Sequence, residues 1–222
     1  KSTFLRNLFV QFDRDWIVDV IDGKYVEFSY LREYGFRVAS DRSEFRDFVT
    51  RAQSEVDERA KEMEKNRVNH YEKMGYKPYF LVIDEFIFVA ESLSSKREKG
   101  QERSEREQFF EDLRDIVLRG RACGVFLVLV LQRPDAAYLP TIVRDNLMAR
   151  VVLGQGSETA YEMVFGSERK KLTPLVLGQG YMECGEFGVF SFPNYDMELF
   201  LEDLKFRRAE KLVDIRERSA VQ

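Results

Sequence analysis

The stretch that decides the fold is FLVIDEF at residues 80–86, an uninterrupted apolar run that ends in Asp84 and Glu85. The run lacks the alternation of apolar and polar residues that a half-buried strand shows. It therefore predicts a strand buried on both faces, which is typical of a parallel sheet covered by helices. A second run of this kind, VFLVLVL at 125–131, ends in Gln132. Ligands of such sheets bind beyond the carboxyl ends of the strands, so we expect the chemistry near these three polar residues.

Helices and further strands surround these two strands. Apolar stripes and polar caps predict helices over 3–12, from Asp41 to a stop at Gly75 and Pro78, and over 109–121, 157–165 and 196–219. Further strands are expected at 16–22, 36–39 and 149–153, with a closing hairpin of 180–184 and 187–192. The charged segment 92–108 predicts a loop or mobile arm. Together these elements predict an α/β fold with a mostly parallel sheet, helices on both faces and a C-terminal β-hairpin.

The composition bounds the class of protein. A chain of 222 residues, 44% hydrophobic and 33% charged, without an apolar run of about 20 residues, suits one large soluble α/β domain. Its net charge of −4 argues against a nucleic-acid binder that depends on bulk positive charge, so any phosphate contact would need local basic loops. The single histidine, His70, lies among polar residues, which argues against a His-based zinc site and a Ser-His-Asp hydrolase. Cys123 and Cys184 are expected to be buried, reduced thiols.

The acidic pair at the strand end has a defined chemistry. A carboxylate at the tip of a buried strand, here Asp84, can hold Mg²⁺, because this hard cation prefers oxygen ligands. The next carboxylate, Glu85, can polarise a water for attack on a γ-phosphate. The alternative is an acidic pair that simply ends a strand.

The first three residues, Lys1-Ser2-Thr3, directly precede a predicted helix. A phosphate-binding P-loop ends in Gly-Lys-Ser/Thr at a helix start, where the lysine reaches the β- and γ-phosphates and the hydroxyl binds Mg²⁺. Only the last part of that signature is present, so the alternative is an ordinary helix cap. Lys-Ser-Thr at a helix start, a strand ending in Asp-Glu and a strand ending in Gln together follow the order of a RecA-like ATPase.

With these motifs the chain resembles a known family, the FtsK/SpoIIIE DNA translocases of the HerA-FtsK group of P-loop ATPases. Within the family it is most similar to the FtsK-like coupling proteins of Gram-positive integrative and conjugative elements. The run from Gly120 to Pro134 is the most specific. The matching stretches are KST (1–3), FLVIDEF (80–86), RGRACGVFLVLVLQRPDAAYLP (119–140), IVRDNLMARVVLG (142–154) and VLGQGYMECGEFGVF (176–190).

The resemblance implies a role for each matching residue. For the nucleotide and metal, it implies that Lys1 binds phosphate, Ser2 and Asp84 hold Mg²⁺, and Thr3 contacts the α-phosphate. For catalysis, it implies Glu85 as the base, Gln132 as the γ-phosphate sensor and Arg121 as the arginine finger, with Arg119 a weaker candidate. Two alternatives stay open. Gln132 could make a strand-end hydrogen bond, and Arg121 could complement a helix dipole.

Family members act as ring hexamers that thread DNA through a central pore. The resemblance therefore implies a DNA-binding pore loop at 92–106, which carries Lys96, Arg97, Lys99, Arg103 and Arg106, and a second at 135–144 with Arg144. The alternative for the first loop is a solvated segment whose cations pair with the interleaved acids Glu98, Glu102, Glu105 and Glu107.

The expected protein is thus a single RecA-like motor domain over 1–222, truncated at its N-terminal side within the P-loop. We expect no counterpart of the winged-helix module of chromosome translocases before Gln222. The resemblance implies an ATP- and Mg²⁺-dependent coupling protein that moves DNA during conjugation, in a homo-oligomeric ring. Relaxase and secretion-channel partners are implied, with a cytoplasmic location at the membrane through a segment outside this chain. Alternatives are a type VII-like protein secretion ATPase and a degenerate ATPase-like assembly platform.

Overall fold

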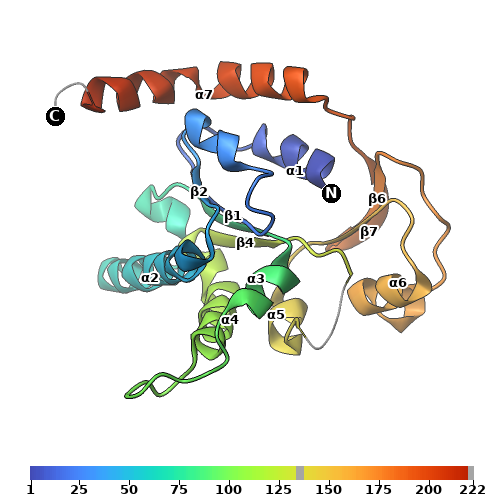
Figure 1. Cartoon of the computed structure of the whole chain (residues 1–222), viewed down its shortest axis with the longest axis horizontal. Coiled ribbons are helices and arrows are strands. Elements are labelled where there is room, and N and C mark those ends of the chain that lie inside the picture. Colours follow the sequence, from blue (N-terminus) through green and yellow to red (C-terminus); the bar gives the residue numbers. More distant parts are fainter. Residues whose placement is uncertain (134–137, 220–222) are drawn as a thin grey trace. The chain divides into compact units, whose positions relative to one another are not determined.

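The computed structural model describes residues 1–133 and 138–219, with side chains of the last helix up to Arg208, and shows an α/β fold with two sheets (Figure 1). The chain divides into two compact units, each described by itself. The parallel-sheet unit contains residues 14–131 and the chain after Arg208, and the antiparallel-sheet unit contains residues 1–13 and 132–208.

The parallel-sheet unit is built on four parallel strands in the order β2-β1-β3-β4. The strands are β1 (Ile17–Asp22), β2 (Arg37–Ala39), β3 (Tyr79–Asp84) and β4 (Val125–Leu129). The tripeptide Val-Ile-Asp occurs at 20–22 and again at 82–84, and the two copies pair in register, so Asp22 lies opposite Asp84. The valines and isoleucines of both copies are completely buried. The prediction of a parallel sheet is therefore confirmed. Strand β3 is buried along nearly its whole length, but residues 126–129 of β4, the last strand in the order, are only partly buried, so the prediction of burial on both faces is wrong for β4.

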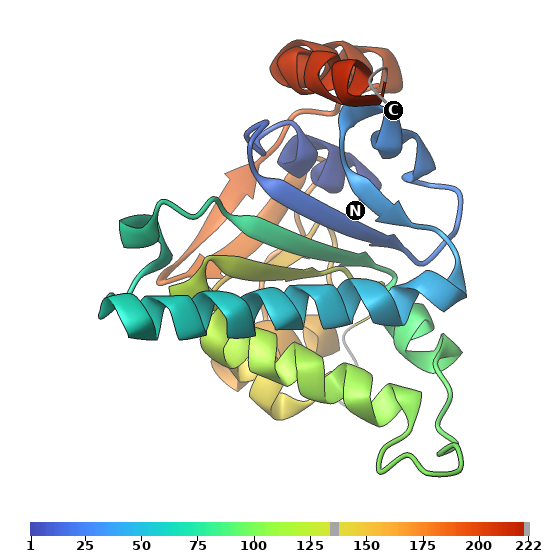
Figure 2. The same cartoon turned by 90° about the vertical axis from the view of Figure 1, so that its left-hand side faces the viewer.

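Three α-helices and two 3-10 helices lie within residues 14–131 of this unit. They are η1 (Ser29–Tyr34), α2 (Arg42–Asn66), η2 (Tyr71–Met74), α3 (Phe86–Ser92) and α4 (Glu105–Cys123). The long helices α2 and α4 lie side by side on one face of the sheet (Figure 2). Apolar side chains at helical spacing, such as Phe45, Val49 and Val56 of α2 and Leu113 of α4, are fully buried. The apolar stripes read from the sequence are thus the stripes that form the core.

One buried carboxylate joins three elements of this unit. Asp19 of β1 is completely buried and accepts hydrogen bonds from the Tyr79 hydroxyl at 2.6 Å and from Arg37 Nε at 2.5 Å. Arg51 of α2 adds a third contact at 3.3 Å. Burial and the adjacent Asp19 carboxylate raise the pKa of the Tyr79 phenol above its ordinary value. Asp19 therefore satisfies the rule that a buried charge is paired and hydrogen-bonded.

The antiparallel-sheet unit contains three strands in the order β5-β6-β7. Its elements are α1 (Ser2–Phe9), α5 (Thr141–Asn146), β5 (Arg150–Leu153), α6 (Glu158–Phe165), η3 (Ser167–Arg169), β6 (Gln179–Cys184), β7 (Glu186–Ser191) and the start of α7 (Met197–Ser219). Tyr161, Phe165 and Tyr181 form a small core of their own. The predicted C-terminal hairpin is confirmed, with Gly185 at φ 75° in its turn.

Several helices differ from the prediction. Helix α2 ends at Asn66, well before Gly75, because Arg67 adopts a left-handed conformation (φ 55°, ψ 38°) and donates its N–H to the Glu64 carbonyl. Helix α4 begins at Glu105 rather than 109, because Ser104 and Glu107 form a reciprocal capping box. The short helix α3 was not predicted.

The predicted burial of both thiols is also wrong for one of them. Both cysteines are free, but Cys184 is exposed at the end of β6 while Cys123 is buried. Across residues 1–133 and 138–219, no helix has the length and apolar character needed to cross a membrane.

Candidate functional site

The predicted acidic pair lies at the carboxyl end of β3. Asp84 is the last residue of the strand and is 2% exposed. Glu85 follows in the left-handed conformation (φ 50°, ψ 50°) and is the N-cap of α3. Non-glycine residues adopt this region uncommonly, and such residues cluster at functional sites. The backbone conformation therefore changes abruptly between the two acids.

The backbone around this pair is held by Val130, just beyond β4. The Val130 N–H donates to the Ile83 carbonyl at 2.9 Å, and the Val130 carbonyl accepts from the Phe86 N–H at 3.0 Å. One residue thus forms hydrogen bonds on both sides of the acidic pair. The first amide of α3 is satisfied by this tertiary contact, although the first amides of a helix lack partners within it.

The turn after β1 contributes residues that the sequence did not single out as functional. Asp22 is completely buried, and its two carboxylate oxygens accept from the backbone N–H groups of Lys24 at 3.0 Å and Phe28 at 2.8 Å. These bonds fold residues 22–28 into a tight turn beside the end of β3. The sequence Asp22-Gly23 had indicated only the end of a strand.

Gly23 brings this turn into direct contact with the acidic pair. A Cβ atom at Gly23 would lie 2.6 Å from the Asp84 carbonyl oxygen and 3.0 Å from Glu85 Cβ. Only glycine fits so close to backbone. The turn and the acidic pair therefore form one packed structure.

Lys24 carries the cation of this structure. Its Nζ lies 2.7 Å from Glu27 Oε2, 3.5 Å from Glu85 Oε1 and 3.8 Å from Asp84 Oδ2. Burial alone would lower the pKa of Lys24, but the hydrogen bond to Glu27 and the charges of Asp84 and Glu85 outweigh it and raise the pKa. Lys24 is therefore fully protonated at neutral pH. The sequence signal that could have found it is the Val-Ile-Asp tripeptide at 20–22, which repeats that of β3 and marks the strand that pairs with it.

The donor atoms at this edge suit a hard cation. Within the described residues, no group of three or more His, Cys, Asp or Glu side chains could hold a metal ion by itself. Mg²⁺ in nucleotide sites is held by one or two carboxylates together with water and phosphate oxygens, so a single buried carboxylate such as Asp84 fits it. The residues here thus fit a metal that arrives with its nucleotide.

The predicted phosphate-binding residues begin α1 in the antiparallel-sheet unit. Lys1 is the N-cap of α1, and its side chain makes no capping hydrogen bond. The helix is anchored by the Phe4 ring, whose centroid lies 5.7 Å from that of Phe190 and 5.3 Å from that of Phe192. Ser2 and Thr3 form the first helical positions, as the P-loop prediction requires. Since the acidic pair belongs to the other unit, its opposition to Lys1 stays a prediction.

The segment after β4 carries the predicted sensor and the second predicted pore loop. Gln132 is exposed and follows the end of the strand by three residues. Residues 134–137 lie outside the described part of the chain. Residues 141–144 belong to helix α5 rather than to a loop, so the loop prediction is wrong there. Arg144 Nε lies 3.0 Å from Asp145 Oδ1.

The two candidate arginine fingers on α4 differ in their surroundings. Arg119 Nη1 lies 2.7 Å from both Asp57 Oδ1 and Asp115 Oδ2, and these bonds raise its pKa. Arg121 is exposed in the last turn of α4, and its guanidinium forms no ion pair within residues 1–133 and 138–219. Arg119 thus serves the packing of α4 on α2, and Arg121 keeps its predicted role together with the dipole alternative.

The charged loop before α4 is largely paired with the helix that follows. Arg97 donates to both Glu107 oxygens, from Nε at 3.1 Å and from Nη2 at 2.8 Å. The hydrogen bonds from Arg97 and the Ser104 backbone lower the pKa of Glu107 to about 2. Arg103 Nε lies 2.9 Å from Glu111. In the part of the chain that the structure describes, Lys96 and Lys99 form no ion pair, so they are the cations that the loop presents.

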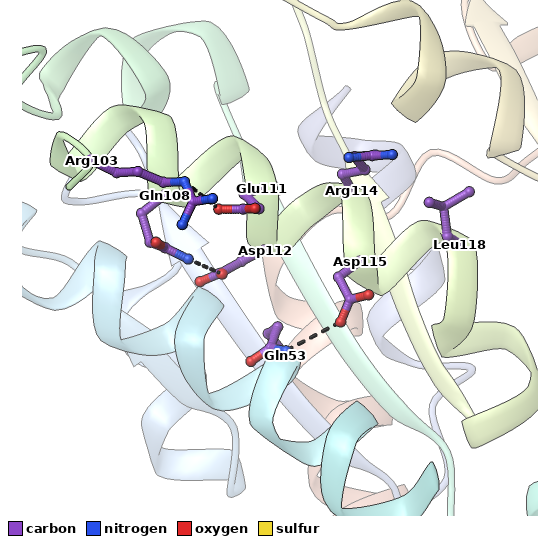
Figure 3. Close-up of a pocket in the computed structure, with 8 residues that line it drawn as sticks. All are labelled: Gln53, Arg103, Gln108, Glu111, Asp112, Arg114, Asp115 and Leu118. Carbon is purple, nitrogen blue, oxygen red and sulfur yellow. Dashed lines mark hydrogen bonds and ion pairs between the residues drawn. The ribbon is translucent and has the colours of Figure 1, made fainter.

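A polar groove of about 500 Å³ lies between α2 and α4 (Figure 3). Its polar groups bond to one another: Arg103 to Glu111, Gln108 to Asp112 and Gln53 to Asp115. Three carboxylates face the groove, so it does not suit a phosphate group. Its lining residues are Gln53, Arg103, Gln108, Glu111, Asp112, Arg114, Asp115 and Leu118.

Known proteins are similar to this chain in sequence and in fold. No protein family model matches the chain. Over 124 residues, it is 36% identical to the FtsK domain-containing protein YdcQ of Bacillus subtilis (strain 168). The matched segment covers 55% of this chain and 24% of YdcQ. The chain is a homologue of an FtsK domain-containing protein. The resemblance stated from the sequence is confirmed at this level.

Solved structures share the fold of this FtsK domain homologue. The pCW3 conjugation coupling protein TcpA, described as a monomer with ATPγS, matches with a TM-score of 0.72 and 22% identity over 91% of this chain and 59% of that chain. The cytoplasmic domain of the type VII secretion ATPase EccC from Thermomonospora curvata matches with a TM-score of 0.67 and 19% identity, over 93% of this chain and 26% of that chain. EssC (ATPases 2 and 3) from Geobacillus thermodenitrificans matches with a TM-score of 0.66 and 14% identity, over 98% of this chain and 41% of that chain. The predicted RecA-like fold is confirmed.

The chain spans about a quarter of YdcQ and about three fifths of the TcpA chain.

Proposed function

We propose that the chain is a P-loop ATPase motor that moves DNA during conjugative transfer and hydrolyses ATP at the subunit interfaces of a ring. The observation that carries the proposal is the acidic pair of buried Asp84 and partly buried Glu85 at the carboxyl end of β3, in the fold shared with a conjugation coupling protein. Homology to an FtsK domain-containing protein supports it.

The proposed chemistry divides the site residues by role. Lys1 binds the β- and γ-phosphates, Ser2 and Asp84 hold Mg²⁺, and Thr3 contacts the α-phosphate. Glu85 accepts the proton of the attacking water, Gln132 senses the γ-phosphate, and Arg121 completes the site of the neighbouring subunit. Mg²⁺ supplies charge neutralisation on the phosphate oxygens. The exposed position of Arg121 suits a contact with another subunit.

The proposed assembly is a homo-oligomeric ring, with six subunits as in the family that the sequence resembles. Its proposed partners are DNA, a relaxase and secretion-channel proteins. We place it as a cytoplasmic motor domain that reaches the membrane through a segment outside this chain.

Turnover of ATP per subunit is expected to rise with protein concentration and to rise again on addition of DNA. An arginine supplied by a neighbour accelerates hydrolysis strongly, so assembly should raise the rate at least about tenfold. A coupled ATPase assay across a dilution series, with and without DNA, measures both effects. A rate per subunit that is independent of protein concentration would contradict the shared site.

A second function shares this fold. EccC is a type VII secretion ATPase, and its TM-score of 0.67 approaches that of the coupling protein. A protein secretion motor would not respond to DNA, so DNA-stimulated hydrolysis separates the two functions. A degenerate assembly platform would fail to bind nucleotide, which a titration with a fluorescent ATP analogue detects.

Reversing the charge of the loop at 96–99 is expected to weaken DNA binding. The variant Lys96→Glu, Arg97→Glu, Lys99→Glu removes three cations, two of which form no ion pair within residues 1–133 and 138–219. Each lost phosphate contact lowers the salt dependence of log K by about one. Fluorescence anisotropy with labelled DNA over a series of salt concentrations measures the slope and the affinity.

A matched control reverses three exposed cations near the end of α2, Lys61, Lys65 and Arg67. It changes the net charge equally and tests whether the loop acts locally. Equal loss of affinity in both triple variants, or none in the loop variant, would exclude the pore-loop assignment.

A further inference from the structure

The ammonium of Lys24 lies within ion-pair distance of both acids of the candidate site. Its Nζ is 3.5 Å from Glu85 Oε1 and 3.8 Å from Asp84 Oδ2. Lys24 comes from a different strand end, some 60 residues earlier in the chain.

We propose that Lys24 is a positioning residue that fixes the carboxylate of Glu85 and competes with divalent cations for the acidic pair. The proposal rests on the function proposed above for Glu85.

The position of the ammonium is set by the fold. Glu27 accepts a hydrogen bond from Lys24 Nζ at 2.7 Å. This bond restrains the Lys24 side chain from moving into solvent. The Lys24 backbone N–H is bonded to the buried Asp22 carboxylate at 3.0 Å. Both ends of the Lys24 residue, backbone and ammonium, are therefore held.

The close contact at Gly23 keeps this turn against the strand end. A Cβ atom added at Gly23 would lie 2.6 Å from the Asp84 carbonyl oxygen. Glycine has no side chain, so the turn can pack this close to β3, and the close packing leaves it no room to move nearer. The distance between Lys24 and the acids is thus a property of the packed backbone.

The charges and their exposure determine what the ammonium does. The side chains of Asp84 and Glu85 are 3% and 12% exposed, whereas that of Lys24 is 35% exposed. Interactions at the two acids are therefore screened less by water than a surface ion pair would be. A cation there orients Glu85 and also offsets the repulsion between the two carboxylates. A metal ion that binds Asp84 must do so against the charge of Lys24.

The first test compares turnover and nucleotide affinity in purified full-length protein. Lys24→Met is expected to lower kcat about 10- to 100-fold, as loss of a group that orients a catalytic ligand does, with the Kd for an ATP analogue changed by less than about twofold. Lys24→Arg keeps the charge and should recover at least about tenfold of the loss. In a Glu85→Gln background, Lys24→Met should have no further effect on kcat, because the residue acts through Glu85.

The second test does not depend on hydrolysis. Mn²⁺ binding to the nucleotide-free protein, followed by electron paramagnetic resonance, is expected to be about 3- to 10-fold tighter in Lys24→Met than in the wild type, because the competing cation is gone. Lys24→Arg should bind Mn²⁺ like the wild type. Lys24→Gln, with a similar chain length, replaces Lys24→Met if the latter lowers the unfolding temperature.

The outcomes separate the two proposals. If the wild type hydrolyses ATP and Lys24→Met has the same kcat and the same Mn²⁺ affinity as the wild type, the role proposed for Lys24 is wrong. A loss of kcat that persists in the Glu85→Gln background would do the same. Absence of turnover in the wild type would instead refute the ATPase, and the Mn²⁺ comparison would still decide whether Lys24 competes for the acidic pair.

Discussion

Glu85→Gln is expected to lower the rate of ATP hydrolysis about 1,000-fold and to leave the Kd for nucleotide within about twofold of the wild type. The amide has the size of the carboxylate but cannot accept a proton from water. Because Glu85 is 12% exposed and already sits in a left-handed backbone conformation, an isosteric change tests the chemistry with little change in packing. A single-turnover assay together with a binding titration measures the two quantities.

The matched control for this variant is Glu91→Gln, an exposed acid on the same helix α3. It makes the same change of charge outside the site and should hydrolyse ATP like the wild type. If Glu85→Gln retained more than about a tenth of the wild-type rate, Glu85 would not be the base, and the reading of this pair as a simple strand end would stand.

Gly124→Ala is expected to destabilise the protein by about 3 kcal/mol, the largest effect on stability that we expect from one small substitution. Gly124 ends α4 in a left-handed conformation with φ 73°, which costs a side chain about 1 kcal/mol. An added Cβ would also lie 2.5 Å from Cγ of Tyr71, which is close to the Tyr71 backbone and cannot swing away. Urea unfolding followed by circular dichroism measures the loss.

Gly75→Ala separates the two causes. Gly75 ends the 3-10 helix η2 with nearly the same φ, 72°, but an added Cβ would meet nothing within 4 Å. It should cost only the backbone term, about 1 kcal/mol. If both variants lost the same free energy of unfolding, the contact with Tyr71 would relax without cost. The left-handed backbone conformation alone would then explain the glycine at 124.

Much of the fold could be predicted from the sequence, because its decisive elements are local patterns. The runs at 79–83 and 125–131 are apolar without interruption, which favours strands of a parallel sheet covered by helices. The ends of helices were less predictable. Arg67 stops α2 in a backbone conformation that arginine rarely adopts, and no composition signal announces it. By contrast, Ser104 and Glu107 have capping-box spacing, so the start of α4 was visible in the sequence.

The candidate site was only half predictable. Asp84 and Glu85 follow a diagnostic strand and were found at once. Lys24 and Glu27 were not, since their nearness to the acids depends on the register that sets Asp22 opposite Asp84. A register between strands 60 residues apart arises from packing of the whole sheet, and residue types alone do not encode it. The repeated Val-Ile-Asp tripeptide was the available clue.

The two hydrogen bonds of Val130 have a consequence for how this edge of the sheet moves. They join the chain after β4 to the peptide groups on both sides of Asp84-Glu85, at Ile83 and at Phe86. Local opening of one segment must break contacts of the other, so the strand end, the acids and the first turn of α3 form one cooperative unit of partial unfolding. Any event that pulls on the chain beyond Val130 is therefore transmitted through the backbone itself to the carboxylates.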